Sequence, residues 1–275
     1  MTTRLTQSLF KFAAWSLLIG SPAYALAECS RGVNVPIAPI GLSVFVASDK
    51  TVSGVYPDVL RSAGAKEGCS FQFTVVPRAR LDVLFEAGQA DMLIPASKSP
   101  SRDVHGVFVP LIFSRATLIS LASDRPAIRS ARELLDRRDL KVAVVRGFDF
   151  GPAYQSLLQE LTGQGRIVQD VDALSVARLM QAGAVDLTIM APSIFVGAIQ
   201  GDARTEGLLE KLRYEPIDEL PWGDSGAYIS KTSLSEGDQK ALKHLLDRSN
   251  TSGAVWKAFQ RYYPPKALTG SIRSR

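Results

Sequence analysis

Three arginines, Arg78, Arg80 and Arg102, have side chains that can bind a small anion. A guanidinium group keeps its charge when partly desolvated and can donate two parallel hydrogen bonds to a carboxylate. Arg78 and Arg80 lie at the start of a predicted helix, where the helix dipole makes a cation mildly unfavourable. This misfit favours a ligand role for one of them; the alternative for all three is an ordinary solvated arginine.

The turn 147–151 (GFDFG) is a second candidate contact for an anion. It precedes a predicted helix, and backbone N–H groups at a helix N-terminus bind anions. Phe148 and Asp149 are the side chains we expect nearest the ligand. The alternative is a plain strand-to-helix turn in which Phe148 and Phe150 pack locally. Tyr56 is a candidate aromatic for the edge of a cleft, with burial in the core as its alternative.

No catalytic or metal-binding motif accompanies these residues. The sequence has no G-x-S-x-G, H-E-x-x-H or glycine-rich P-loop pattern. His105 has no obvious orienting partner, which disfavours a role as general base. The two cysteines, Cys29 and Cys69, and the two histidines, His105 and His244, lack the spacing of zinc ligands. We therefore predict neither a metal nor a cofactor.

Residues 1–27 have the pattern of a cleaved secretory signal. Arg4 and Lys11 precede a short apolar run, and Ala25-Leu26-Ala27 fits the small-x-small cleavage rule. The run is shorter than the roughly 20 residues that span a bilayer. We expect export to the periplasm and a mature chain that begins at Glu28, with an uncleaved anchor as the alternative.

The charge balance argues against a nucleic-acid partner. Two of the 32 basic residues and none of the 27 acidic residues lie in 1–27, which leaves 30 basic against 27 acidic residues in the rest. This surplus is mild, and no dense basic run marks a binding face.

An even pair of cysteines in an exported chain predicts a disulfide between Cys29 and Cys69. Each precedes a predicted strand, so the pair can bridge if those strands are neighbours. The loop of about 40 residues would be worth roughly 3–4 kcal/mol. Two free thiols are the alternative.

Predicted strands and helices alternate, which is typical of an α/β fold with mainly parallel sheets. Apolar, β-rich runs predict strands at 33–38, 71–76, 92–94, 107–109, 116–121, 141–145, 167–169, 187–190 and 226–230. Capping signals and amphipathic spacing predict helices at 54–63, 79–87, 130–135, 151–161, 172–181, 235–249 and 253–262, and another that begins at Pro192.

The strand–helix order occurs twice, and the second round lies between two extended crossings near residues 116 and 226. This indicates two α/β lobes: 28–115 with 226–275, and 116–225. Two lobes joined by two strands make a hinge and a cleft.

Four segments have patterns that occur together in one known family. Residues 54–60 (GVYPDVL) are similar to its G-φ-D-φ-D-L helix opening, 84–91 (LFEAGQAD) and 180–186 (MQAGAVD) to its L-x-x-G-x-x-D run, and 97–102 (SKSPSR) to its T-x-T-x-E-R ligand loop. Over nearly all of its length after residue 27, the chain resembles the family 3 extracellular solute-binding proteins. These are type II periplasmic binding proteins that serve ABC importers of polar amino acids.

The resemblance implies that Arg102 binds the carboxylate of the ligand and that Ser97 donates a hydroxyl hydrogen bond to it. Arg78 stands where amino-acid binders of the family usually have an aromatic that stacks on the ligand. Ala191 stands where they commonly have an aspartate that pairs with the amine. The missing aspartate and a convergence of Arg78, Arg80 and Arg102 would favour an anionic ligand, with Asp149 as the alternative partner for an amine.

The resemblance further implies a monomeric periplasmic protein that delivers a small carboxylate-bearing solute, an amino acid or another organic anion, to an ABC permease. We expect no enzyme activity. One alternative is an enzyme like the cyclohexadienyl dehydratases, which use this fold; its acid would have to come from Asp149, Glu86 or His105. The other is a sensory protein that presents its ligand to a membrane receptor.

Overall fold

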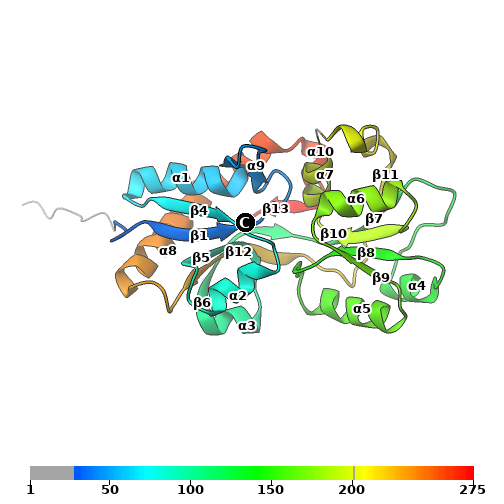
Figure 1. Ribbon diagram of the computed structural model, residues 1–275, viewed down its shortest axis with the longest axis horizontal. Helices are drawn as coiled ribbons and strands as arrows, with labels where there is room; N and C mark the ends of the chain where they lie inside the picture. The colour runs from blue at the N-terminus through cyan, green and yellow to red at the C-terminus, as the bar shows by residue number, and fades with distance from the viewer. Residues whose placement is uncertain (1–27, 201) are drawn as a thin grey trace, which may run out of the picture.

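The computed structural model describes residues 28–200 and 202–275, so the predicted secretory signal at 1–27 lies outside the described residues. Two α/β lobes lie end to end along the longest axis of the molecule (Figure 1). Among the described residues, no helix combines the length and the hydropathy that a membrane span requires.

The first lobe contains a parallel pair of strands, a four-stranded sheet and a short hairpin. The pair is β1 (Val33–Ile37) with β4 (Phe71–Val75), and the hairpin is β2 (Phe45–Val46) with β3 (Val52–Ser53). The sheet has the order β13 (Ile272–Ser274), β6 (Gly106–Ser114), β12 (Gly223–Ser230), β5 (Met92–Ser97). The helices are α1 (Val55–Glu67), α2 (Arg80–Glu86), α3 (Pro100–His105), α8 (Glu236–Thr251), α9 (Ala254–Tyr262) and α10 (Pro265–Leu268).

The second lobe is built on one five-stranded sheet. Its order is β11 (Leu212–Glu215), β7 (Thr117–Leu121), β10 (Leu187–Met190), β8 (Val142–Val145), β9 (Ile167–Asp170). The helices are α4 (Ala131–Asp136), α5 (Pro152–Gly163), α6 (Ala173–Gln181) and α7 (Pro192–Ile199), and two 3₁₀ turns follow at Ala203–Thr205 and Leu209–Lys211.

The expectation of mainly parallel sheets was wrong. β12 runs antiparallel to both β5 and β6, and β7 runs antiparallel to both β10 and β11. Within the described chain, three pairs are parallel: β1–β4, β8–β9 and β8–β10. The physical reason is that β6 carries the chain out of the first lobe and β12 brings it back, so the two run in opposite directions.

The chain passes between the lobes twice, from β6 to β7 and from β11 to β12 (Figure 1). β6 ends at Ser114, β7 begins at Thr117 and β12 begins at Gly223. The predicted limits of the lobes, 28–115 with 226–275 and 116–225, stay predictions.

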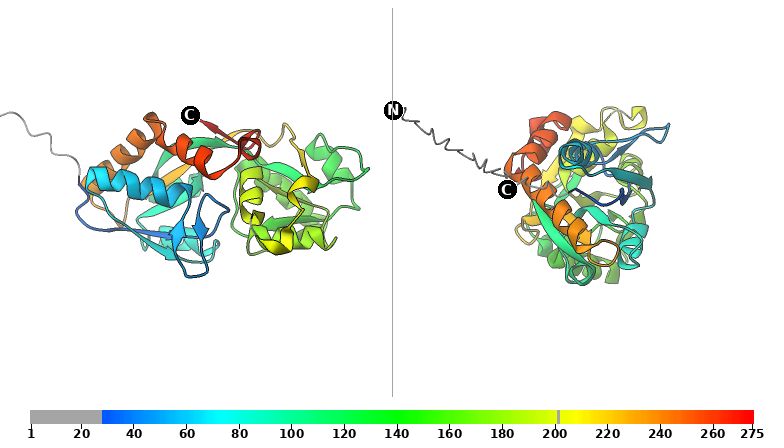
Figure 2. Two further views of the ribbon diagram at one scale, coloured as in Figure 1. Left: turned by 90° about the horizontal axis from the view of Figure 1, so that it is seen from above. Right: turned by 90° about the vertical axis from the view of Figure 1, so that its left-hand side faces the viewer.

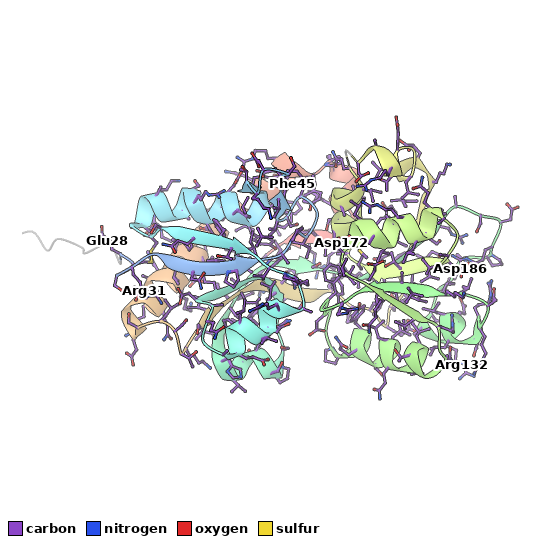
Figure 3. All side chains as sticks on the ribbon, viewed as in Figure 1. Glu28, Arg31, Phe45, Arg132, Asp172 and Asp186 are labelled. Atoms are coloured by element: carbon purple, nitrogen blue, oxygen red, sulfur yellow. A yellow bond between two sulfur atoms is a disulfide. The ribbon has the colours of Figure 1, made fainter. Side chains whose placement is uncertain are left out.

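Corresponding aspartates hold the outer end of each lobe. Asp91 accepts a hydrogen bond from Asn34 N, and Asp186 accepts one from Lys141 N, each at 2.7 Å. Each aspartate thus holds the backbone at the start of a neighbouring strand. Arg31, which forms an ion pair with Asp91 at 2.6 Å, and Asp186 lie at opposite ends of the molecule (Figure 3).

Helix starts follow the capping signals of the sequence. Ser130 Oγ accepts from the N–H of Glu133 at 3.1 Å, which confirms the predicted cap of α4. Helix α3 was missed, because 97–102 was expected to be a loop. Ser99 caps this helix and Pro100 begins it, a pairing that favours helix initiation and could have revealed it.

Cys29 and Cys69 form a disulfide, with 4.9 Å between their Cα atoms, so the predicted bridge is confirmed. It is possible because β1 and β4 are neighbours, with Val33 paired to Phe71. The adjacent Glu28 lies at the end of the first lobe far from the second (Figure 3). The disulfide therefore ties the described N-terminus to the end of α1, away from the boundary between the lobes.

Candidate ligand-binding site between the lobes

A cavity of about 50 Å³ lies between the lobes. The first lobe contributes residues of α1, β5, β6 and β12, and the second contributes the turn 147–151 and the start of α7. β5 ends at the cavity, and β8 ends just before the turn. In open α/β folds, ligands bind outside the carboxyl ends of the strands, so the fold itself makes this the expected place for a ligand.

The structure brings five of the predicted site residues to this cavity and leaves two outside it. The lining includes Tyr56, Arg78, Ser97, Phe148 and Asp149. Arg80 is exposed on α2, and Arg102 is buried behind the wall. The expected convergence of three arginines is therefore absent, and the preference for an anionic ligand loses that support.

Arg78 is the one cation among the described residues that line the cavity. Its contacts are long: Nε lies 3.5 Å from Gly147 O, and Nη2 lies 3.4 Å from Pro95 O. Within the described ranges it forms no ion pair. Burial lowers the pKa of Arg78 to about 10, and the positive charge of Arg102 adds to this effect. An anion placed beside Arg78 would restore the lost electrostatic stabilisation.

Arg102 has its donors occupied within the first lobe. Nε and Nη2 donate to the two carboxylate oxygens of Asp82 at 2.8 and 3.1 Å, and Nη1 donates to Ser97 O at 2.9 Å. Its side chain is only 6% exposed. Burial by itself lowers the pKa of Arg102, but the ion pair with Asp82 outweighs it and the pKa is raised. A ligand role for Arg102 stays a prediction, and it would require Asp82 to be displaced.

Ser97 and Asp149 connect the two lobes. Ser97 Oγ at the end of β5 donates to Asp149 O at 2.7 Å. The Asp149 carboxylate accepts from Gly151 N at 2.9 Å and from Gln155 Nε2 at 3.1 Å, both through Oδ1. The Asp149 carboxylate thus occupies the Gly151 N–H, one of the donors that we expected to bind an anion. Pro152, the first residue of α5, has no N–H group to donate.

Aromatic rings close two sides of the cavity. The Arg78 guanidinium lies 5.7 Å from the centre of the Phe148 ring, a cation–π distance. Tyr56 is buried and meets Phe259 edge-on at 5.7 Å. Burial raises the pKa of Tyr56, and its hydrogen bond with Ser225 opposes this only partly, so its hydroxyl stays neutral.

The second-lobe helix α7 contributes contacts that the sequence did not reveal. Ser193 and Ile194, two and three residues after Ala191, line the cavity, whereas Ala191 is buried and provides no carboxylate. The N–H of Ser193 donates to Ser271 Oγ at 2.9 Å, which links α7 to the C-terminal segment of the chain. The Pro192 signal predicted the helix, but nothing in the local pattern showed that its first turn faces the other lobe.

A second hollow, of about 300 Å³, lies beside the cavity. Phe45 of the first lobe and Asp172 of the second line it, and both lie near the boundary between the lobes in Figure 3. Phe148 and Ile40 line both spaces. The Phe148 ring is therefore part of the partition between the central cavity and the outer hollow.

Solved structures share this arrangement of lobes at low sequence identity. An ancestral arginine-binding protein bound to arginine matches with 14% identity and a TM-score of 0.68, covering 85% of this chain and 99% of that one. A histidine kinase sensor domain similar to periplasmic binding proteins matches with 16% identity and a TM-score of 0.68, covering 84% and 96%. The chain has the periplasmic-binding-protein fold. An ancestral amino-acid-binding protein, a precursor of cyclohexadienyl dehydratase, matches with 15% identity and a TM-score of 0.66, covering 85% and 96%.

Most of these matching structures are binding proteins rather than enzymes. No family model matches the sequence, and no curated protein matches it either. Of the three acids that dehydratase chemistry would draw on, Asp149 lines the cavity, whereas Glu86 and His105 lie outside its lining. Two other aromatics lie outside this lining: Trp222 has Arg273 4.7 Å from the centre of its ring, and Tyr228 is buried in the first lobe.

Proposed function

We propose that this protein is a periplasmic solute-binding protein that captures a small carboxylate-bearing solute between its lobes and delivers it to an ABC importer. The observation that carries the proposal is Arg78, a half-buried cation at the lobe boundary without a carboxylate partner among the described residues. A charge kept in such a place is unfavourable unless a bound anion compensates it.

The cavity suits a small solute. Its volume of about 50 Å³ is well below the range of about 300–1,000 Å³ typical of drug-sized ligands. On the scale of roughly 10–15 Å³ for one water, the closed lobes hold about three to five non-hydrogen atoms. Arg78 and Asp149 offer opposite charges to a solute that carries both a carboxylate and an amine, whereas a plain carboxylate would use Arg78 alone.

Contacts between the two lobes would couple solute binding to closure of the lobes. Ser97 Oγ to Asp149 O and Arg78 to Gly147 O both join the lobes and both lie at the cavity. A solute that binds here contacts both lobes at once, so it favours the closed form over the open form. A permease that recognises the closed form would then distinguish loaded protein from empty protein.

Calorimetric titration with amino acids, short monocarboxylates and dicarboxylates tests the proposal, with thermal unfolding as a second readout. A bound solute at 100 times its dissociation constant stabilises the folded state by about 2.7 kcal/mol. Arg78→Ala should abolish binding, and Arg80→Ala is the matched control, because it removes the same side chain two residues away outside the cavity.

Three outcomes would count against the proposal. Loss of binding in Arg80→Ala but not in Arg78→Ala would show that the site lies elsewhere. Turnover of prephenate or arogenate would replace the proposal with the dehydratase alternative. Normal solute uptake by cells that lack this protein, together with loss of a signalling response, would replace delivery to an importer with the sensory alternative.

A further inference from the structure

A larger hollow lies on the outside of the first lobe. It measures about 830 Å³ and is lined by α1, α8 and α9. These three helices pack against one another on one face of the lobe (Figure 2). None of its lining residues lines the cavity between the lobes, so it is a separate site.

The buried part of the groove lining, here called its floor, is mostly apolar, and several of its side chains are small. Ala63, Ser249 and Ala258 lie along it, with the buried side chains of Val59 and Leu245 beside them. Small residues on facing helices leave space between the helices that longer side chains would fill. The groove is therefore formed mainly by the side chains of three helices, with Ser252 of the turn between α8 and α9 also in its lining.

The rim of the groove is strongly basic. Its cations are Arg61, Lys66, Arg248, Lys257 and Arg261, against two carboxylates, Asp58 and Glu67. Both carboxylates are already engaged: Arg261 and Arg61 lie 3.3 and 3.6 Å from Asp58, and Arg248 lies 2.7 Å from Glu67. Within residues 28–200 and 202–275, Lys66 and Lys257 form no ion pair.

The basic surplus of the chain is concentrated here. Beyond residue 27 the sequence has 30 basic and 27 acidic residues, a surplus of three. The groove lining, with five basic and two acidic residues, has a surplus of three by itself. The remaining residues have no net formal charge, and the local positive surplus of the groove favours an anionic partner.

We propose that the groove is a docking site for an acidic segment of a partner protein, with apolar side chains on the floor and carboxylates against the rim. The concave shape and apolar floor fit an inserted segment better than a flat membrane surface. Lys66 and Lys257 would supply the cations that the segment neutralises. The proposal does not depend on the identity of the solute.

Fluorescence anisotropy with a labelled peptide of repeating Glu-Leu-Glu-Ala units tests the proposal on the purified protein. We expect binding that weakens with salt, and affinity lower by about ten-fold or more in a Lys66→Glu/Lys257→Glu double variant. The matched control is Lys240→Glu/Lys243→Glu, which makes the same change of charge on α8 outside the groove. Circular dichroism and solute titration check that both variants fold.

Several results would overturn the proposal. Equal weakening by the two double variants would mean that diffuse charge attracts the peptide. If a peptide with Gln in place of every Glu bound as tightly as the original peptide, the carboxylates would have no part in binding. Preferential binding of phosphatidylglycerol vesicles, or full competition by inorganic phosphate, would assign the groove to a membrane or to a free oxyanion.

Discussion

Arg102 on α3 donates to both carboxylate oxygens of Asp82 on α2, so its guanidinium fork is occupied by a residue of the same lobe. Arg78, on the loop before α2, lines the boundary cavity and has only long contacts with backbone carbonyls. Of the two, Arg78 is therefore the one whose hydrogen-bonding capacity remains for a solute.

This difference predicts opposite effects for two substitutions. Arg102→Ala should lower the free energy of unfolding by about 2–4 kcal/mol, because it breaks a largely buried ion pair, and should leave solute affinity nearly unchanged. Arg78→Ala should abolish binding and should raise the free energy of unfolding at neutral pH, because burial disfavours the charge that the substitution removes. Denaturant unfolding and calorimetric titration of both variants check this. Asp82→Asn tests the alternative that Arg102 binds the solute. In that case, removing the Asp82 carboxylate, which competes for Arg102, would raise the affinity for the solute.

Solute affinity should fall at high pH. The pKa of Arg78 is lowered to about 10 from its ordinary value, so the free protein loses this charge as the pH rises through about 10. A carboxylate binds best to the protonated form, and affinity is therefore highest below that range. Because the unfolded chain holds this proton longer, the group by itself makes the free energy of unfolding rise with pH between about 10 and 12.5. Titration with an amine-free carboxylate measures the first effect, and a pH-independent affinity would contradict it.

Gly197→Ala should weaken binding without weakening the fold. A Cβ at Gly197 would lie 2.6 Å from Leu42 N and 3.0 Å from the Tyr263 hydroxyl, both in the first lobe. Alanine within a helix is more favourable than glycine by about 1 kcal/mol, so the second lobe itself should not suffer. We expect an affinity lower by about ten-fold and a larger radius of gyration in X-ray scattering. Gly163→Ala on α5 is the control, since its Cβ meets nothing within 4 Å.

Phe148→Ala should admit larger solutes. The Phe148 ring is part of the partition between the cavity of about 50 Å³ and the outer hollow of about 300 Å³, so we expect its removal to join the two. The buried ring also contributes packing, so the free energy of unfolding should fall by about 3–5 kcal/mol. Titration with solutes of increasing length checks the prediction. Phe150→Ala, which lines the cavity but not the outer hollow, should leave the size preference unchanged.

The disulfide should stabilise the folded protein without changing its affinity for the solute. Cys29 and Cys69 are 40 residues apart, so replacing both with serine should lower the free energy of unfolding by roughly 3–4 kcal/mol. Solute affinity should stay the same, because the bridge lies at the end of α1 that is far from the second lobe. Thermal unfolding and titration, with and without reductant, measure both quantities; reduced affinity in the serine variant would contradict this separation.

The sequence by itself determined the local structure and the two-lobed fold. Short apolar, β-rich runs located β1, β4 and β10, and capping residues such as Ser130 located helix starts, because these signals arise between residues close along the chain. The disulfide between Cys29 and Cys69 could be predicted because each cysteine precedes one of the strands β1 and β4. Three different signals pointed to residues that line the cavity: a family motif to Ser97, the turn before a predicted helix to Asp149, and an aromatic side chain to Tyr56.

Only the tertiary structure decided which arginine faces the solute. Arg78 and Arg102 are equally basic in sequence, and their difference depends on Asp82, whose proximity to Arg102 follows from the packing of α2 against α3. Strand direction in the first lobe likewise depends on how the chain leaves and returns. Interactions between residues distant in sequence are set by the packing of whole elements, and the pattern of any one segment does not contain them.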